Sequence, residues 1–231
     1  MDNTMNDKIE KILTNPAIGA ASQMHPLLAA AHSSLITSLT NIQNERREVF
    51  MDELSRGKIR FEDKIAQSDP FVHCFIITYD AAMRSLQRQK NQYFAHLLSS
   101  SFESSELYNV TEYEEYLNML NETSSRELWI LVVLSKYEKK HRNIHGKLTL
   151  KEVSIYWDAF IAEISSKLSI SSEEINAILT RLNKSGLYST IVGSYVGYYG
   201  DRGTLTPIYY KLEDLIKPIE GDFIDDDFLN D

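Results

Sequence analysis

The last third of the chain carries the pattern that most constrains its fold. An amphipathic segment over residues 171–187 (SSEEINAILTRLNKSGL) ends beside a glycine, and an aromatic run over residues 188–199 follows it. A Gly-Asp-Arg-Gly turn comes next, and Pro207 then opens a last apolar segment that reaches Ile216. Glycine readily adopts the left-handed conformation that ends a helix, and proline fits the first turn of the next one. This order of helix, glycine stop, hairpin and closing helix predicts a winged helix-turn-helix domain.

Three capping boxes predict where helices begin in the second half of the chain. In this motif a Ser or Thr side chain and a Glu three residues later bond each other's backbone N–H groups. The three pairs are Thr111 with Glu114, Thr149 with Glu152, and Ser171 with Glu174. Together with an apolar face over residues 125–141, they predict four helices ahead of the hairpin.

The first half of the chain is predicted to form long helices. Apolar residues recur on one face over residues 26–55, and Gly57 ends that segment. A short helix over residues 6–13 precedes it, and another over residues 60–66 follows. An apolar stripe of this length has to be covered by a neighbouring helix, since burying a large side chain contributes roughly 1.5–3 kcal/mol.

A second long helix is predicted after Ser68-Asp69-Pro70. Ser68 can cap the free N–H groups of the first turn, and Pro70 already has helical φ. Apolar side chains at three- and four-residue spacings then continue to Leu97, which predicts one helix of about 30 residues. The serine-rich run over residues 99–105 predicts a loop.

These elements predict a mainly α protein with an N-terminal helical domain of long antiparallel helices and a C-terminal winged helix with one β-hairpin. The domain boundary is placed at the polar break near residue 123. The expected parts are a weakly structured segment over residues 1–24, a helical domain over 25–123, a winged-helix domain over 124–218 and an acidic tail over 219–231.

Charge differs between these parts. The chain has a net charge of −9, yet residues 124–218 hold 13 basic and 10 acidic side chains, and residues 219–231 hold six acidic and no basic ones. A mildly basic domain beside an acidic tail permits nucleic-acid binding, although such domains are usually more basic. The tail could also dock on the basic domain and compete with nucleic acid, or serve only as a solubilising end.

The chain is expected to be a cytoplasmic, non-enzymatic protein without a cofactor. Its start lacks the cationic and apolar regions of a secretory signal, and the apolar run over residues 128–134 is too short to cross a membrane. Cys74 is the single cysteine. His141 and His145 have a spacing that could bind zinc, but no further ligand is near, so a surface role is expected. Phosphate-loop and nucleophile-elbow motifs do not occur.

The chain resembles poorly characterised bacterial helical proteins with a C-terminal winged helix, several of which belong to mobile or defence-associated loci. The resemblance spans residues 45–216. It is carried by QRQKNQYFAHLL, RELWILVVLSKYEK, INAILTRLNKSGL and LTPIYYKLEDLI. It implies that the helix after Ser171 lies in the DNA major groove and that the hairpin follows the backbone.

The predicted nucleic-acid contacts are polar or cationic side chains of that helix and of the hairpin turn: Asn176, Thr180, Arg181, Lys184 and Arg202. Arginine and lysine there could bind phosphates or a narrow minor groove. Glu173 and Glu174 argue against base reading, because they occupy the helix start and would repel phosphates.

Tyrosines of the hairpin and an aromatic residue of the preceding long helix predict a protein interface. Tyr198 and Tyr199 are expected on the surface, Tyr195 in the core, and Trp157 on a face covered by another domain or subunit. Two functions therefore stay open: a nucleic-acid-binding or regulatory protein with duplex DNA as partner, and an adaptor that assembles as a homodimer or hetero-complex.

Overall fold

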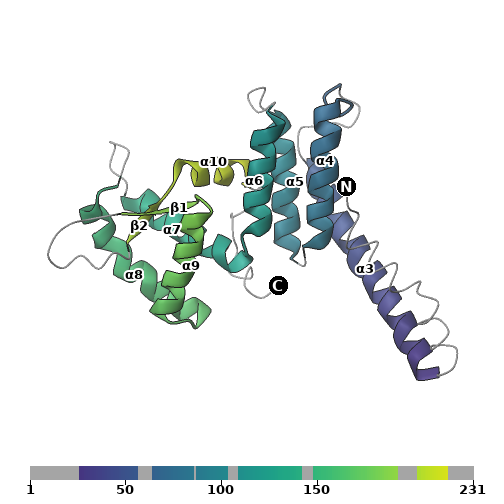
Figure 1. Ribbon diagram of the computed structural model, residues 1–231, viewed down its shortest axis with the longest axis horizontal. Helices are drawn as coiled ribbons and strands as arrows, with labels where there is room; N and C mark the ends of the chain where they lie inside the picture. The colour runs from purple at the N-terminus through teal and green to yellow at the C-terminus, as the bar shows by residue number, and fades with distance from the viewer. Residues whose placement is uncertain are drawn as a thin grey trace. The chain divides into compact units, whose positions relative to one another are not determined.

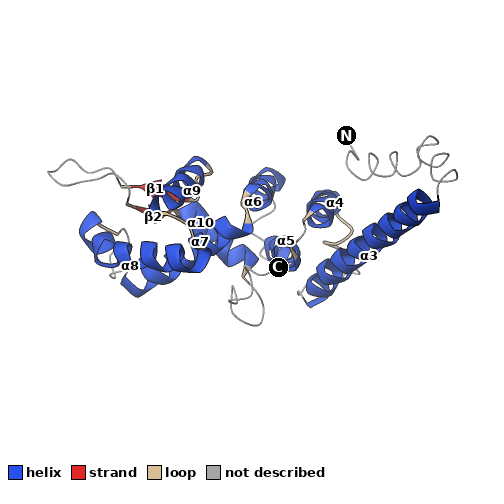
Figure 2. Cartoon of the chain, turned by 90° about the horizontal axis from the view of Figure 1, so that it is seen from below, coloured by secondary structure: helices blue, strands red, loops and turns tan. Residues whose placement is uncertain are grey.

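The computed structural model describes residues 26–56, 64–85, 87–103, 109–141, 148–191 and 202–217. Within these ranges the protein has eight helices and one small antiparallel pair of strands, so the prediction of a mainly helical chain is confirmed (Figures 1 and 2). The chain divides into two compact units, Met1–Val49 and Phe50–Asp231. In the described segments, every helix is too short or too polar to span a bilayer.

Helix α3 (Pro26–Arg56) forms where the apolar pattern predicts it. Its last turns belong to the second unit, where Phe50 and Leu54 are buried. The ring of Phe50 makes edge contacts with Phe75 and Tyr79, at centroid distances of 6.2 and 5.8 Å. The end of α3 is therefore part of the aromatic core of that unit.

The prediction of a single helix of about 30 residues after Ser68 is wrong. The structure has two helices there, α4 (Asp69–Arg84) and α5 (Arg88–Glu103), which lie side by side (Figure 1). Phe71 and Phe102, which would lie roughly 46 Å apart in one straight helix, meet with ring centroids 5.1 Å apart. Folding back buries the apolar stripe against itself, which a straight helix cannot do.

Ser85 forms the break between the two helices. Its backbone is extended at ψ 130, while its N–H still bonds the carbonyls of Ala81 and Ala82. Its hydroxyl accepts a hydrogen bond from the N–H of Gln87 at 3.4 Å. Serine competes with the helix by such local bonds, which the apolar spacing alone does not reveal. At the other end of α4, the predicted cap is confirmed, because the Ser68 side chain accepts from Phe71 N–H.

The prediction of a loop over residues 99–105 is also wrong for the residues that the structure describes, because residues 99–103 continue α5. Ser99 and Ser101 are 2 % and 1 % exposed. The hydroxyl of Ser99 donates to the carbonyl of His96. A serine that returns its hydroxyl to its own helix is tolerated inside it.

Helix α6 (Val110–Glu122) begins one residue before the predicted cap. Asn109 is the N-cap, and its side chain accepts from the N–H of Thr111 at 3.1 Å. Glu114 does not complete a capping box; its carboxylate bonds Nε2 of His73 at 2.8 Å. The capping box predicted at Thr111 is therefore wrong, because asparagine two residues earlier is the stronger cap.

The C-terminal part follows the predicted order of elements. It consists of α7 (Ser125–His141), α8 (Leu150–Leu168), α9 (Ser172–Lys184), β1 (Tyr188–Thr190), β2 (Gly203–Leu205) and α10 (Pro207–Ile216). The capping boxes of α8 and α9, the left-handed Gly186 at φ 80 and the proline at the start of α10 are confirmed.

The two strands pair in antiparallel register, with Tyr188 opposite Leu205 and Thr190 opposite Gly203. Gly203 therefore belongs to a strand and not to the turn predicted for it. A Cβ at this position would collide with the ring of Tyr188 and the carbonyl of Ser189. The glycine is required by close packing inside the hairpin.

Helix α10 connects the C-terminal part to the helices before it, because it packs against α5. Its Lys211 also lies 3.8 Å from Glu112 of α6. The boundary predicted near residue 123 thus falls inside the second compact unit. The predicted helix over 6–13, the hairpin tip and the acidic tail lie outside the described residues. Of the helix predicted over 60–66, residues 64–66 are described, and they form a turn.

Candidate nucleic-acid interface

Helix α9 has one buried face and one open face. Ile175, Ile178, Leu179 and Leu182 are at most 4 % exposed and fix the helix on the core. The capping box fixes its start, since the N–H of Ser171 donates to Glu174 at 3.0 Å and the N–H of Glu174 donates back to the serine hydroxyl. The side chains predicted to contact nucleic acid occupy the opposite face.

Asn176 and Thr180 lie one turn apart on that face. Thr180 is exposed and Asn176 half-buried, and the hydroxyl of Thr180 donates to the backbone carbonyl of Asn176 at 2.8 Å. Farther along, Nδ2 of Asn183 donates to Oγ1 of Thr190 in β1 at 3.4 Å. The outer face of α9 is therefore continuous with the first strand of the hairpin.

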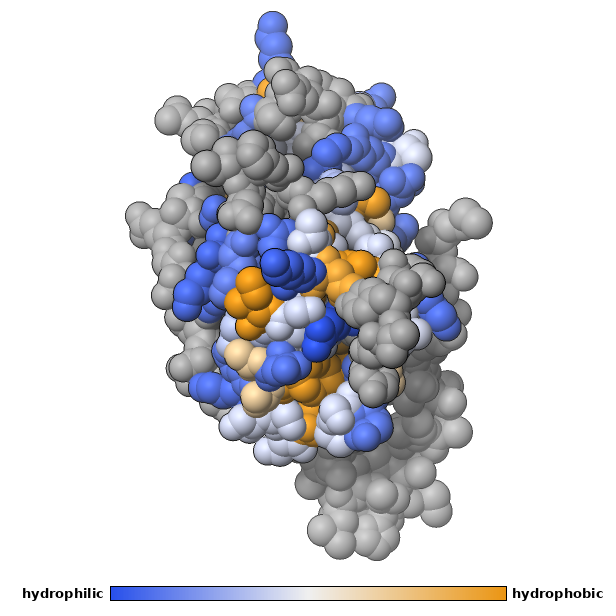
Figure 3. All heavy atoms as spheres, turned by 90° about the vertical axis from the view of Figure 1, so that its left-hand side faces the viewer, coloured by the Kyte–Doolittle hydropathy of each residue, from blue (hydrophilic) through white to orange (hydrophobic). Residues whose placement is uncertain are grey.

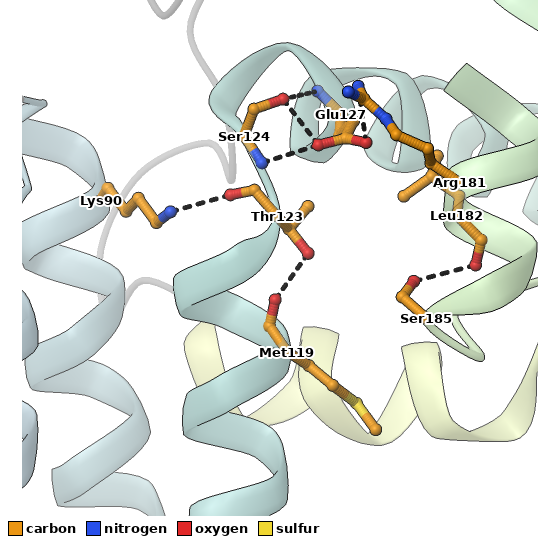
Figure 4. A network of polar contacts seen from close by, with 8 residues as sticks. All are labelled: Lys90, Met119, Thr123, Ser124, Glu127, Arg181, Leu182 and Ser185. Atoms are coloured by element: carbon orange, nitrogen blue, oxygen red, sulfur yellow. Dashed lines mark hydrogen bonds and ion pairs between the residues drawn. The ribbon is translucent and has the colours of Figure 1, made fainter. Parts of the chain in front are cut away.

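Arg181 is the best-held cation of α9. Its guanidinium lies 2.9 Å from Oε1 of Glu127, and the two side chains are 63 % and 8 % exposed (Figure 4). Glu127 belongs to the first turn of α7, so this ion pair ties α9 to the junction of α6 and α7. The sequence predicts Arg181 as a nucleic-acid contact, and it does not reveal this partner.

Glu127 also completes a capping box at the start of α7, which is not among the three predicted from the sequence. Its Oε2 accepts from the N–H and the hydroxyl of Ser124 at 2.9 and 2.7 Å, and its own N–H donates to that hydroxyl at 3.3 Å. The sequence contains the signal, because Ser124-Ser125-Arg126-Glu127 fits the Ser-x-x-Glu pattern. All three helices α7, α8 and α9 thus begin with this motif.

Lys90 of α5 reaches the same junction. Its Nζ donates to the carbonyls of Asn121 and Thr123 at 2.9 and 2.8 Å, at the C-terminal end of α6. Figure 4 shows the bond to Thr123. Burial lowers the pKa of Lys90 to about 8, and attraction by Glu127 acts in the opposite direction. Two cations, Lys90 and Arg181, therefore share the field of one buried carboxylate.

Lys184 lines a shallow hollow of about 310 Å³ together with Glu122, Thr123, Glu127, Arg181 and Ser185. Its side chain is exposed. No carboxylate of the described residues forms an ion pair with it. Lys184 is thus the more available of the two cations on α9.

Arg202, predicted at the hairpin turn, lies against α8. Its guanidinium donates to Oγ of Ser154 at 2.5 Å and lies 3.7 Å from Asp158. The Arg202 side chain is 33 % exposed and that of Asp158 is 89 % exposed. This pair is open to water, so it holds the arginine far less firmly than a buried carboxylate would.

Among the described residues of the C-terminal part, three acidic side chains are buried: Glu127, Glu138 and Glu213. Glu138 accepts from the N–H of Leu205 and the hydroxyl of Tyr210, at 2.7 and 2.6 Å. Glu213 accepts from Ser135 and Lys139, at 2.8 and 2.7 Å. In the pairs of Glu127 with Arg181 and Glu213 with Lys139, the carboxylate is inside and the cation outside, so the exposed end of each is positive.

The residues predicted for a protein interface lie in different places. Trp157 is 4 % exposed and packs with Phe160 at 5.3 Å, inside the core. Tyr198, Tyr199 and Tyr195 lie outside the described residues. Figure 3 shows the end of the molecule formed by α8, α9 and the hairpin, where apolar areas are interrupted by polar side chains. Ile155 of α8 is 68 % exposed.

The described residues were compared with the requirements of a metal site and of a cysteine nucleophile. They contain no group of three or more His, Cys, Asp or Glu side chains that could hold an ion. Nδ1 of His141 contacts the carbonyl of Tyr137 at 2.8 Å. Burial raises the pKa of the Cys74 thiol to about 11, which suppresses the thiolate that nucleophilic chemistry requires.

Comparison of the chain with protein-family models, with curated proteins and with solved structures finds no match.

Proposed function

We propose that α7 to α10 form a winged helix and that the protein binds double-stranded DNA through α9 and the hairpin. The observation that carries the proposal is the outer face of α9. It combines amide and hydroxyl groups with Arg181 and Lys184, and the hairpin follows it after only three residues. Helices of this kind fit the major groove, while a hairpin can follow the phosphate backbone.

Inward-pointing carboxylates support the proposal electrostatically. Residues 124–218 hold 13 basic and 10 acidic side chains, and three of the acidic ones, Glu127, Glu138 and Glu213, are buried. Two of these three carboxylates pair with Arg181 and Lys139, whose side chains are exposed, so each pair has its cationic end toward the solvent. The net charge of this part stays at +3, and phosphate contacts dominate the affinity of DNA-binding proteins.

Glu173 limits the kind of binding that we propose. It is exposed in the first turn of α9, where backbone N–H groups and the Ser171 hydroxyl lower the pKa of its carboxyl. A carboxylate there repels phosphate and can accept hydrogen bonds only from base amino groups such as cytosine N4. The proposal is therefore for modest affinity carried by the C-terminal half of α9 and by the hairpin.

Fluorescence anisotropy of a labelled DNA duplex, measured over a series of salt concentrations, tests the proposal. We expect a dissociation constant in the micromolar range or below at low salt, weakening with a slope of about −0.9 in log K per phosphate contact. Lys184→Gln should reduce that slope by about 0.9. Lys211→Gln, on the exposed face of α10 beside α6, is the matched control and should leave it unchanged. Absence of binding, even after removal of residues 219–231, contradicts the proposal.

A second candidate function is self-assembly as an adaptor, and exposed apolar residues of α4 favour it. Val72 and Ile76 lie one turn apart and are 42 % and 60 % exposed. Light scattering of the purified chain tests this alternative. A dimer that becomes a monomer in Ile76→Glu, but not in Lys211→Gln, supports it, and a monomeric wild type contradicts it.

A further inference from the structure

Glu127 lies beside the proposed DNA-binding face. Its Oε1 is 2.9 Å from the Arg181 guanidinium (Figure 4). A guanidinium binds carboxylate and phosphate by the same N–H groups, so it cannot fully satisfy both at once.

The carboxylate side of this pair is fixed. Glu127 is 8 % exposed, and its other oxygen accepts two hydrogen bonds from Ser124. Burying a carboxylate costs free energy unless it is paired and hydrogen-bonded, so the ion pair of Glu127 with a nearby cation is favoured. The cation side is open to water by comparison, because the Arg181 side chain is 63 % exposed.

Lys90 lowers the cost of opening the ion pair between Glu127 and Arg181. When Arg181 leaves, the Lys90 ammonium stays at the junction, fixed by the carbonyls of Asn121 and Thr123. Glu127 acts electrostatically on this ammonium in the free protein as well. Loss of Arg181 therefore does not leave the carboxylate without a cation nearby.

The other two cations of the face lack such a restraint. Arg202 faces Asp158, which is 89 % exposed and screened by water. Lys184 has no carboxylate partner among the residues that the structure describes. Of the three cations of this face, Arg181 is the one that pairs with a buried carboxylate among the described residues.

We propose that Glu127 restrains Arg181 and lowers the affinity of the protein for DNA, so that the ion pair must open before Arg181 can bind a phosphate. This inference rests on the proposed function. It makes the junction of α6 and α7 sensitive to DNA, because the residue that caps α7 is the one that releases Arg181.

The decisive variant is Glu127→Gln. Glutamine serves as well as glutamate at this position of a capping box, so the variant removes the charge and keeps the cap. We expect about fivefold tighter binding of the same DNA duplex, which corresponds to release of one ion pair at the upper end of the usual range. The salt dependence should be the same in both chains, since Arg181 binds a phosphate in each complex once the pair has opened.

Two comparisons isolate Arg181 as the cause. Asp214→Asn, on the exposed face of α10, makes the same change in net charge and measures its general effect on binding. Glu127→Gln combined with Arg181→Gln should lose the whole gain. Glu127→Asp provides a second route if the first variant unfolds, because its shorter side chain keeps the charge but should reach Arg181 less well and give a smaller gain.

The outcomes separate this inference from the proposed function. If wild type and Glu127→Gln bind DNA with equal affinity, the restraint is refuted and DNA binding stands. A gain that persists without Arg181, or that Asp214→Asn reproduces, also refutes it. If neither wild type nor Glu127→Gln binds at low salt, the proposed function fails and the inference falls with it.

Discussion

The carboxylate of Glu138 accepts a hydrogen bond from the backbone N–H of Leu205 at 2.7 Å, so a side chain of α7 completes the outer edge of strand β2. In a two-stranded sheet each strand has one edge without a partner strand. Glu138 is fully buried, and its second oxygen accepts from the hydroxyl of Tyr210 in α10. One carboxylate thus connects α7, the hairpin and α10.

Replacing this carboxylate should destabilise the C-terminal part. Glu138→Ala leaves the Leu205 N–H and the Tyr210 hydroxyl without an acceptor, and we expect a loss of about 2 to 3 kcal/mol in the free energy of unfolding. Glu138→Gln keeps one acceptor and should cost less. Urea unfolding followed by circular dichroism measures both. The exposed Asp214→Ala is the control and should change stability by less than about 0.5 kcal/mol; an equal effect of all three variants contradicts the role of Glu138.

A buried histidine should make the stability of the second unit depend on pH. Nε2 of His96 lies 2.9 Å from Oε1 of Glu53, and both side chains are nearly buried. Burial lowers the pKa of His96 below its usual value of 6.5, although Glu53 opposes this and Arg56 adds to it. Neutral imidazole is therefore favoured in the folded chain, and the contact is a hydrogen bond to a carboxylate.

The direction of the pH effect follows from proton binding. Below about pH 6.5 the unfolded chain takes up a proton at His96 that the folded chain resists. Stability should be constant for this group above that pH and should fall as the pH decreases toward the folded-state pKa. Urea unfolding between pH 8 and 5 should show a smaller decrease in His96→Gln than in the wild type. His73→Gln, whose side chain is 49 % exposed, should behave as the wild type does.

Gly203 should tolerate no side chain. A Cβ there would collide with the Tyr188 ring and the Ser189 carbonyl, both part of the facing strand. Gly203→Ala should therefore separate the strands and cost about 1 to 3 kcal/mol in unfolding free energy. Gly186 is the matched comparison, since its φ is 80 but nothing lies within 4 Å of an added Cβ. Gly186→Ala should cost only about 1 kcal/mol, from backbone strain; a larger loss than that of Gly203→Ala contradicts this account.

Local signals predicted the C-terminal elements well and the long-range contacts poorly. The caps at Thr149 and Ser171 depend on residues three positions apart, which sequence displays directly. The break at Ser85 was missed, because an apolar stripe has the same spacing in one long helix and in two that fold back. Arg181 was found as a candidate contact, but its partner Glu127 belongs to another helix, and only the three-dimensional fold brings the two together.

The pKa of the Lys90 amine should depend on the charge of Glu127 in the protein without DNA. Burial lowers its pKa to about 8 from 10.5, while Glu127 raises it. Between these two values the unfolded chain binds the proton more tightly, so the stability contributed by this group rises with pH from about 8 to about 10.5 and is unchanged below about 8. NMR of chains carrying ¹³C-labelled lysine should show Lys90 titrating near pH 8. In Glu127→Gln the midpoint should move lower still, because the attracting charge is gone. A midpoint that stays in place, or moves upward, would mean that Glu127 does not act on Lys90, and that Arg181 alone balances the buried carboxylate.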